Sequence, residues 1–181
     1  MHIHTNWDDI AQSLVCGLVS SFIFLFVTLF LLRPSIKINP YISKIQDEIG
    51  NTKYVFKILN RSLFSAFDVR CELVALERYA VEGENMNVKM TKVPLINRGI
   101  DHMPRFRRRK GMKPYALHAM RFSTYNAGVD LVLNNTAKSL QFSLTARHGL
   151  SGLSKHFTQD FADISVLKAG RFKFGNSLDV V

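Results

Sequence analysis

Residues 14–32 read LVCGLVSSFIFLFVTLFLL, a run of 19 residues without a charged side chain. About 20 apolar residues, rising roughly 1.5 Å each in a helix, match the hydrocarbon core of a bilayer. Arg33 and Pro34 follow the run, and proline does not continue a helix. The run therefore predicts a membrane-spanning helix over residues 13–33, a short tail at 1–12 and one domain at 34–181.

A cleaved signal peptide is the main alternative for this run. It would carry positive residues before a shorter apolar core and small residues at a cleavage site after it. The leader instead contains Asp8 and Asp9 and no Lys or Arg, and Leu32, Arg33 and Pro34 stand where the cleavage site would be. A retained anchor is the expected outcome.

Basic residues beside the span predict its orientation, because Lys and Arg mark the cytoplasmic flank. The N-terminal flank has none, whereas Arg33, Lys37 and Lys44 follow the run. The tail is therefore expected outside and the domain in the cytoplasm. Cys16 in the span and Cys71 in the domain would lie in different phases and form no disulfide, as suits a reducing compartment.

Four small residues of the span could allow helices to approach closely. They are Gly17, Ser20, Ser21 and Thr28. Two interpretations stay open: packing between copies in a homo-oligomer, or an anchor whose phenylalanines simply face lipid.

The domain is dominated by alternation with a period of two, typical of half-buried strands. Leu140, Phe142 and Leu144 alternate with polar residues, whereas residues 54–59 carry apolar side chains on both faces and predict a strand covered on both sides. A phase change near Val74 predicts a bulge or a twist there. The other predicted strands are 36–45, 69–75, 86–93, 115–123, 129–133, 156–161 and 170–174. Eight or nine short strands with little helix predict a mainly β fold, an antiparallel, immunoglobulin-like β-sandwich.

The stretch from Asn97 to Pro114 lacks a strand period and is strongly basic. The candidate binding residues there and just beyond are Arg105, Phe106, Arg107, Arg108, Arg109, Lys110, Lys113 and Tyr115. The whole chain carries a net charge of +10, from 24 basic and 14 acidic residues, which favours an anionic partner. Three interpretations remain open: nucleic acid held by cations and stacked aromatics, anionic membrane lipid, or a solvated loop.

Signs of catalysis are weak. The polar residues His148, Ser151, Ser154, His156, Asp160 and Asp163 are close in sequence, but no nucleophile motif such as G-x-S-x-G surrounds them. The histidines lack the cysteine or carboxylate company of a specific metal site, and no phosphate-binding loop is present. We therefore expect a protein that is not an enzyme, with no catalytic residue, metal or cofactor.

The segment Phe56-Lys-Ile-Leu-Asn60, followed by Phe67-Asp-Val-Arg-Cys-Glu-Leu73, resembles the opening strands of the immunoglobulin-like cytoplasmic domain of inward-rectifier potassium channels. That resemblance implies an immunoglobulin-like sandwich. The chain has neither the second span nor the selectivity filter of such a channel.

The order of a short anchor and a small β domain resembles the membrane effectors of bacterial anti-phage defence systems, including those of retrons and of cyclic-oligonucleotide signalling. The resemblance implies a toxin in the bacterial inner membrane, controlled by a partner complex of protein and nucleic acid (RNA or DNA) and acting through oligomerisation. The alternative is a non-toxic adaptor that tethers a nucleic-acid or protein partner to the membrane.

Overall fold

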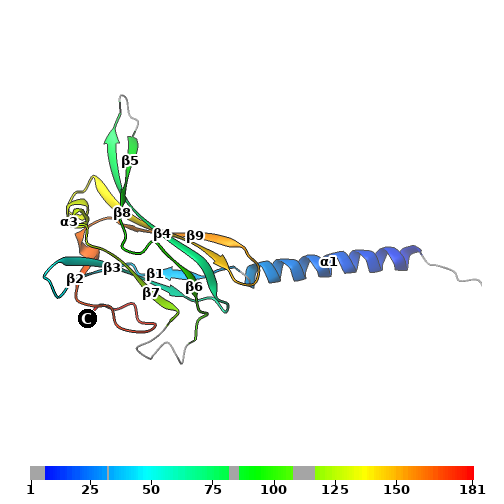
Figure 1. The fold of residues 1–181 in the computed structure, drawn as a ribbon. Coiled ribbons are helices and arrows are strands. Elements are labelled where there is room, and N and C mark those ends of the chain that lie inside the picture. The colour runs from blue at the N-terminus through cyan, green and yellow to red at the C-terminus, as the bar shows by residue number, and fades with distance from the viewer. Residues whose placement is uncertain (1–6, 32, 82–85, 108–116) are drawn as a thin grey trace, which may run out of the picture.

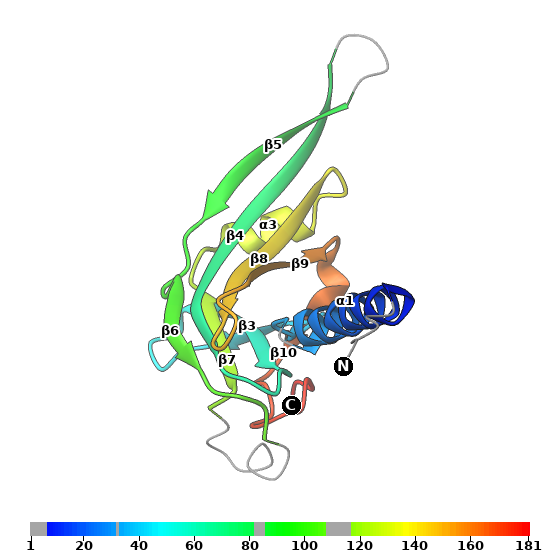
Figure 2. The same cartoon turned by 90° about the vertical axis from the view of Figure 1, so that its right-hand side faces the viewer.

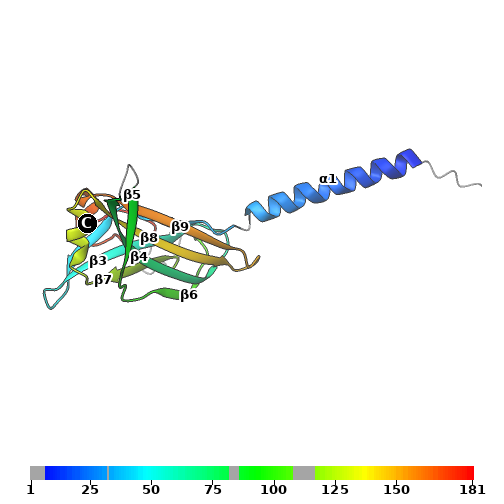
Figure 3. The ribbon, with the colours of Figure 1, turned by 90° about the horizontal axis from the view of Figure 1, so that it is seen from above.

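A computed structural model describes residues 7–31, 33–81, 86–107 and 117–181. Its helix α1 (Trp7–Leu31) projects away from a β domain, roughly along the strand direction (Figures 1 and 3). Within α1, the 20-residue stretch Ile10–Leu29 is long and apolar enough to cross a membrane, and none of it is buried against the domain. The described helix, Trp7–Leu31, includes six residues before the predicted span of 13–33 and covers that span through Leu31.

The first sheet, sheet A, is organised around β3. On one side of β3 lies β7, and on the other lie β1 and β2, which together follow its length; β10 pairs with β2 in parallel. The strands are β1 (Ile36–Ile38), β2 (Ile42–Gln46), β3 (Thr52–Asn60), β7 (Ala119–Thr124) and β10 (Leu167–Ala169). The predicted strand over 36–45 is therefore two strands, broken around Pro40, which has no N–H for a sheet ladder.

The second sheet, sheet B, is organised around β4. Here β5 and β6 share one edge of β4, and β8 and then β9 follow on the other. The strands are β4 (Ala66–Ala80), β5 (Met86–Val93), β6 (Gly99–Met103), β8 (Lys138–His148) and β9 (Ser154–Phe161). The two sheets form the mainly β, sandwich-like fold that the alternation predicted (Figure 2).

The core lies between the sheets and is rich in phenylalanine. Phe56 of sheet A stacks on Phe142 of sheet B at a centroid distance of 5.1 Å, and Phe161 and Phe122 pack around this pair. All four rings are buried. Inter-sheet packing of this kind supplies most of the hydrophobic stabilisation of a sandwich.

Strand β3 is covered on both faces, as its sequence predicted, and the C-terminal segment provides the outer cover. Arg171–Lys173 pairs with Asp179–Val181 as a small hairpin. Lys57, on the outer face of β3, donates from Nζ to the carbonyl oxygens of Lys173 and Ser177 at 2.7 and 2.6 Å. Its ammonium is buried, and this burial lowers the pKa of Lys57 to about 8. Asn39, Ser43 and Arg121 donate to other carbonyls of this segment.

Four other local predictions differ from the structure. Residues 129–133 form the helix α3 (Gly128–Leu133), because Asn126 Oδ1 accepts from the Gly128 N–H and Val129 and Leu133, four apart, bury one helical face. The stretch predicted to lack strands contains β6, whose Met103 is buried in the core. The bulge lies at Asp68 (φ 47°), between Phe67 and Arg70, and not near Val74. The segment 170–174 contains a single bridge at Phe172 instead of a strand.

Candidate functional site at the helix-proximal end of the domain

The linker after α1 is tied directly to the turn between β3 and β4. The Ser35 N–H donates to Ser62 Oγ at 2.7 Å, and the Arg61 N–H donates to the Ser35 carbonyl at 2.7 Å. Four peptide steps separate Leu31 from Ser35 and reach at most roughly 14 Å. The β3–β4 turn therefore lies close to the point where the helix leaves the domain.

Two further loops are hydrogen-bonded to the same turn. The Phe106 N–H donates to the Ser62 carbonyl at 3.1 Å, and the Gly149 N–H donates to the Ser65 carbonyl at 3.0 Å. The β8–β9 turn and the start of the basic segment thus join the β3–β4 turn at the end of the domain nearest α1 (Figures 1 and 3). We call this the helix-proximal end and define it as residues 33–37, 61–65, 103–107 and 147–155.

The helix-proximal end is uniformly basic. Its four segments contain seven of the 24 basic residues and none of the 14 acidic residues of the chain. The cations are Arg33, Lys37, Arg61, Arg105, Arg107, Arg147 and Lys155, all of them exposed. Of these, Arg147 pairs with Asp68 of β4 at 2.6 Å. The opposite end of sheet A differs, because its β2–β3 turn carries Asp47 and Glu48.

Leucines project from two of the same turns. Leu63 in the β3–β4 turn is 68% exposed and Leu150 in the β8–β9 turn is 66% exposed. Leu153 beside Leu150 is also exposed. Single exposed apolar residues are ordinary, but three leucines on neighbouring turns with surrounding cations form an amphipathic surface.

His148 shapes the β8–β9 turn. Its buried ring accepts at Nδ1 from the N–H groups of Leu150 and Ser151, at 3.4 and 3.3 Å, and contacts Ser151 Oγ at 3.2 Å. Burial lowers the pKa of His148, so the neutral imidazole is favoured as the acceptor. The edge of the Phe64 ring lies against it, with centroids 5.1 Å apart.

The polar residues near His148 are not assembled into a triad in the described structure. His156 instead contacts Thr145 at 3.1 Å, Asp160 accepts from Gln141, and Asp163 caps the short helix η1 (Ile164–Val166). Ser154 lies exposed at the start of β9. Each group has a local structural role or faces solvent.

Three residues of the predicted basic site lie in the described structure. Arg105 and Arg107 are exposed, whereas the half-buried Phe106 packs edge-on against His118 with ring centroids 5.3 Å apart. The Phe106 ring thus anchors the loop and is not a free stacking platform. Arg108, Arg109, Lys110, Lys113 and Tyr115 lie outside the described residues.

The four small residues of the helix share one face. At about 100° per residue, Gly17, Ser20, Ser21 and Thr28 fall within a sector of roughly 100°. A Cβ at Gly17 would meet no other atom within 4 Å, so nothing in the described chain occupies this side of the helix at that level. The arrangement permits close packing with another helix.

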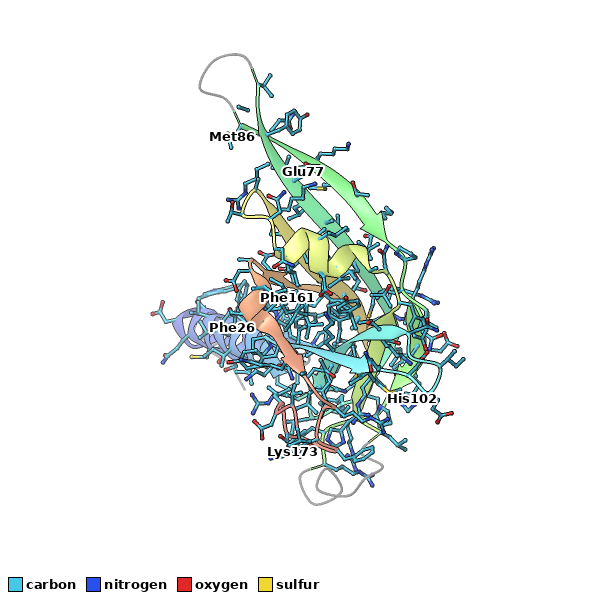
Figure 4. All side chains as sticks on the ribbon, turned by 90° about the vertical axis from the view of Figure 1, so that its left-hand side faces the viewer. Phe26, Glu77, Met86, His102, Phe161 and Lys173 are labelled. Atoms are coloured by element: carbon cyan, nitrogen blue, oxygen red, sulfur yellow. The ribbon has the colours of Figure 1, made fainter. Side chains whose placement is uncertain are left out.

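A second exposed surface is the β4–β5 arm, the described residues 77–81 and 86–89, which extends beyond the sandwich (Figures 1 and 2). Tyr79, Val81, Met86 and Val88 are all exposed on it. Figure 4 shows Met86 near its tip and Glu77 near its base, far from the packed Phe161. Two-stranded ribbons without a covering layer are only marginally stable in water.

A surface pocket of about 400 Å³ lies over sheet B and was missed by sequence reasoning. Arg70, Lys92, Arg98 and His156 line it together with Glu72, which pairs with Lys92 at 2.6 Å. These residues come from β4, β5, the loop before β6 and β9, so no sequence motif unites them. Cys71 also borders the pocket, but burial raises the pKa of its thiol to about 12 and disfavours the reactive thiolate.

Comparisons with known proteins identify no family. No protein-family model matches the chain, and no curated protein matches it. Among solved structures, the crystal structure of the putative ApaA protein from Bordetella pertussis aligns with a TM-score of 0.37 and 5% identity. The alignment covers 72% of this chain and 95% of that one, and a similarity at this level carries no argument about function.

Proposed function

We propose that this chain is a single-pass protein of the bacterial inner membrane and acts there as a toxin effector of an anti-phage defence system. In this proposal the N-terminus is outside and the β domain is cytoplasmic, where it binds a regulatory partner of protein and nucleic acid. Oligomerisation of the helices then perturbs the bilayer. The defence role extends the resemblance in architecture described above.

The membrane part is supported by the exposure of the apolar stretch Ile10–Leu29 of α1. This stretch has a mean hydropathy of 2.2, and no part of it is buried by the β domain. Apolar surface of this extent is unfavourable in water, whereas a bilayer would cover it. The orientation is supported by Arg33 and Lys37 after the helix and the absence of Lys and Arg before it.

The toxic step is assigned to the small-residue face of α1. A single apolar helix cannot line a water-filled path, because its outer surface faces lipid on all sides. Several copies with Ser20, Ser21 and Thr28 turned toward one another would provide hydroxyl groups to such a path. Gly17 on the same face would let the helices approach closely.

The test is controlled expression of the full chain in bacteria, with growth and a membrane-potential dye as readouts. The wild type is expected to stop growth and depolarise the membrane, and the triple variant Ser20→Leu, Ser21→Leu and Thr28→Val to do neither. The matched control, Phe22→Leu with Phe24→Leu, keeps the length and apolar character of the helix and should remain toxic. Unchanged growth and potential with the wild type would argue against the effector role.

A second candidate, the non-toxic adaptor, is favoured by the β4–β5 arm. Its strand β5 is an edge of sheet B and is exposed along nearly its whole length, so a partner's extended strand could pair with it. Replacing residues 10–29 by an unrelated apolar helix separates the two candidates. Retained biological activity supports the adaptor, and lost activity with normal membrane insertion supports the effector.

A further inference from the structure

We infer that the helix-proximal end of the β domain docks on anionic lipid headgroups, with Leu63 and Leu150 inserted between them. The inference rests on the membrane span proposed above and assigns a lipid partner to a surface of the domain. It concerns residues 33–37, 61–65, 103–107 and 147–155, as defined above.

The turns of the helix-proximal end lie where α1 leaves the domain. The Ser35–Ser62 and Arg61–Ser35 hydrogen bonds hold the β3–β4 turn at the exit of α1, and the Gly149–Ser65 bond adds the β8–β9 turn. When α1 spans a bilayer, these turns are brought to its surface by a linker of four residues. The strands run roughly along the helix axis, so the β3–β4 turn, which joins the two sheets, and the turn of the β8–β9 hairpin would face the membrane (Figure 1).

The charge of the helix-proximal end is complementary to that of an anionic membrane surface. The helix-proximal segments contain seven cations and no acid, whereas Asp47 and Glu48 lie in the turn at the opposite end of sheet A. The cytoplasmic leaflet is negatively charged, and its field falls off within about one Debye length, roughly 8–10 Å. Only the basic end lies near enough to the helix exit to experience this field.

The leucines provide a contact that a nucleic acid would not use. Leu63 and Leu150 are exposed at the tips of turns whose backbones are fixed by hydrogen bonds. His148 orders the Leu150 turn by accepting the N–H groups of Leu150 and Ser151. Apolar tips surrounded by cations are the arrangement of interfacial membrane-binding surfaces. The described aromatic residue of the basic segment, Phe106, is already packed against His118.

The test uses the full chain reconstituted in vesicles and the protein's one tryptophan, Trp7. The variant Trp7→Phe with Leu150→Trp places the only indole at the docking surface. The variant Trp7→Phe with Ile49→Trp places it at an exposed position in the opposite turn. The vesicles contain phosphatidylcholine brominated near the headgroup, with or without phosphatidylglycerol.

Bromines are expected to quench the Leu150→Trp fluorescence in vesicles with phosphatidylglycerol, and this quenching should be lost without it. The Ile49→Trp fluorescence should be unquenched in both. Adding Arg61→Glu and Lys155→Glu to the Leu150→Trp variant should abolish its quenching, whereas the control pair Lys53→Glu and Lys168→Glu should leave it intact. All four of these basic residues lie outside the helix.

Absent quenching at Leu150→Trp, or equal quenching at Ile49→Trp, would overturn lipid docking. So would quenching that survives Arg61→Glu with Lys155→Glu. Binding of a single-stranded RNA oligonucleotide that those two substitutions abolish, without lipid quenching, would assign the surface to nucleic acid instead. Native Trp7 tests the span separately: quenched Trp7 with unquenched Leu150→Trp refutes docking alone, and an unquenched Trp7 refutes the span.

Discussion

The backbone N–H of Ser35 donates to the side-chain oxygen of Ser62 across 2.7 Å, which joins the exit of the apolar helix to a turn of the β domain. Ser62 is buried, although it lies in a loop, and its own N–H donates to Asn60 Oδ1 at 2.9 Å. Asn60 Nδ2 in turn donates to the Pro104 carbonyl at 3.0 Å. A short polar network thus connects the linker, the β3–β4 turn and the start of the basic segment.

Ser62→Ala should loosen this connection. The substitution removes the acceptor of the Ser35 N–H, which costs about 1 kcal/mol for a hydrogen bond of this kind. Amide hydrogen exchange should accelerate at Ser35 and Arg61, and the free energy of unfolding in detergent should fall by that amount. Ser154→Ala, at the exposed start of β9, is the control and should change neither quantity.

Lys57→Met should remove a rise in stability at alkaline pH. The folded-state pKa of Lys57 is lowered to about 8 from 10.5 by burial, with the nearby Arg121 charge adding to the effect and Asp179 opposing it. Between these two values the unfolded chain binds a proton that the folded chain has released, so the free energy of unfolding rises with pH. At about 1.4 kcal/mol per pKa unit, the difference between 10.5 and about 8 corresponds to a rise of roughly 3.5 kcal/mol.

Denaturant unfolding of the full chain between pH 8 and 10.5 measures this rise. Wild type and Lys53→Met, which changes a partly exposed lysine of the same strand, should show it equally. If the free energy of unfolding of Lys57→Met rises with pH as steeply as that of the wild type, Lys57 is not the titrating group. At neutral pH the variant also leaves the carbonyls of Lys173 and Ser177 without their donor, which should loosen the C-terminal hairpin.

His148 should make the domain sensitive to acid. Its pKa is lowered from 6.5 by burial, so below pH 6.5 the unfolded chain takes up a proton before the folded chain does. The free energy of unfolding should therefore fall as the pH drops through this region. His148→Asn keeps a polar group near the position of Nδ1 but does not titrate, and should flatten the profile. His156→Asn changes an exposed imidazole, and its free energy of unfolding should fall with decreasing pH as that of the wild type does.

Gly170→Ala should release the C-terminal hairpin. Gly170 has φ +116°, and an added Cβ would overlap the backbone carbonyl of Val181, which is fixed by its bond to the Arg171 N–H. Limited proteolysis should then cleave near the C-terminus, with a stability loss of about 2–4 kcal/mol from strain and steric overlap. Gly152 also has a positive φ, of +70°, but its site is open, so Gly152→Ala should cost less and leave the hairpin protected. Equal proteolysis of both variants would contradict the role assigned to Gly170.

The local pattern of apolar and polar residues was sufficient to predict several strands. Residues 86–93 and 156–161 alternate or carry β-branched and aromatic residues, and β5 and β9 lie there. The apolar pattern on both faces of 54–59 predicted double coverage of β3, which the structure confirms. It could not predict that the covering layer is the C-terminal hairpin, because residues more than 100 positions away provide it.

The local sequence pattern predicted the wrong conformation where contacts with other parts of the chain determine it. Val129–Leu133 is apolar and short enough to suit a strand, yet the Asn126 turn and the Lys44–Asp130 ion pair at 2.6 Å favour a helix against the core. The strand β6 escaped notice because the bulge at Asp68 lets Ile100 and Met103, three apart, face the core together. The charged composition around it also masked any alternation.

Composition and short-range period alone were enough to identify the uncharged apolar run of residues 14–32, the basic flank after it and the mainly β character of the rest. Which loops gather where α1 leaves the domain depends on contacts between distant segments. Hydrogen bonds from the backbone N–H groups of three separate segments bring these loops together. The donors are Ser35, Phe106 and Gly149, and the acceptors are Ser62 Oγ and the carbonyls of Ser62 and Ser65. Such bonds depend on strand order and register, which no local pattern of side chains encodes.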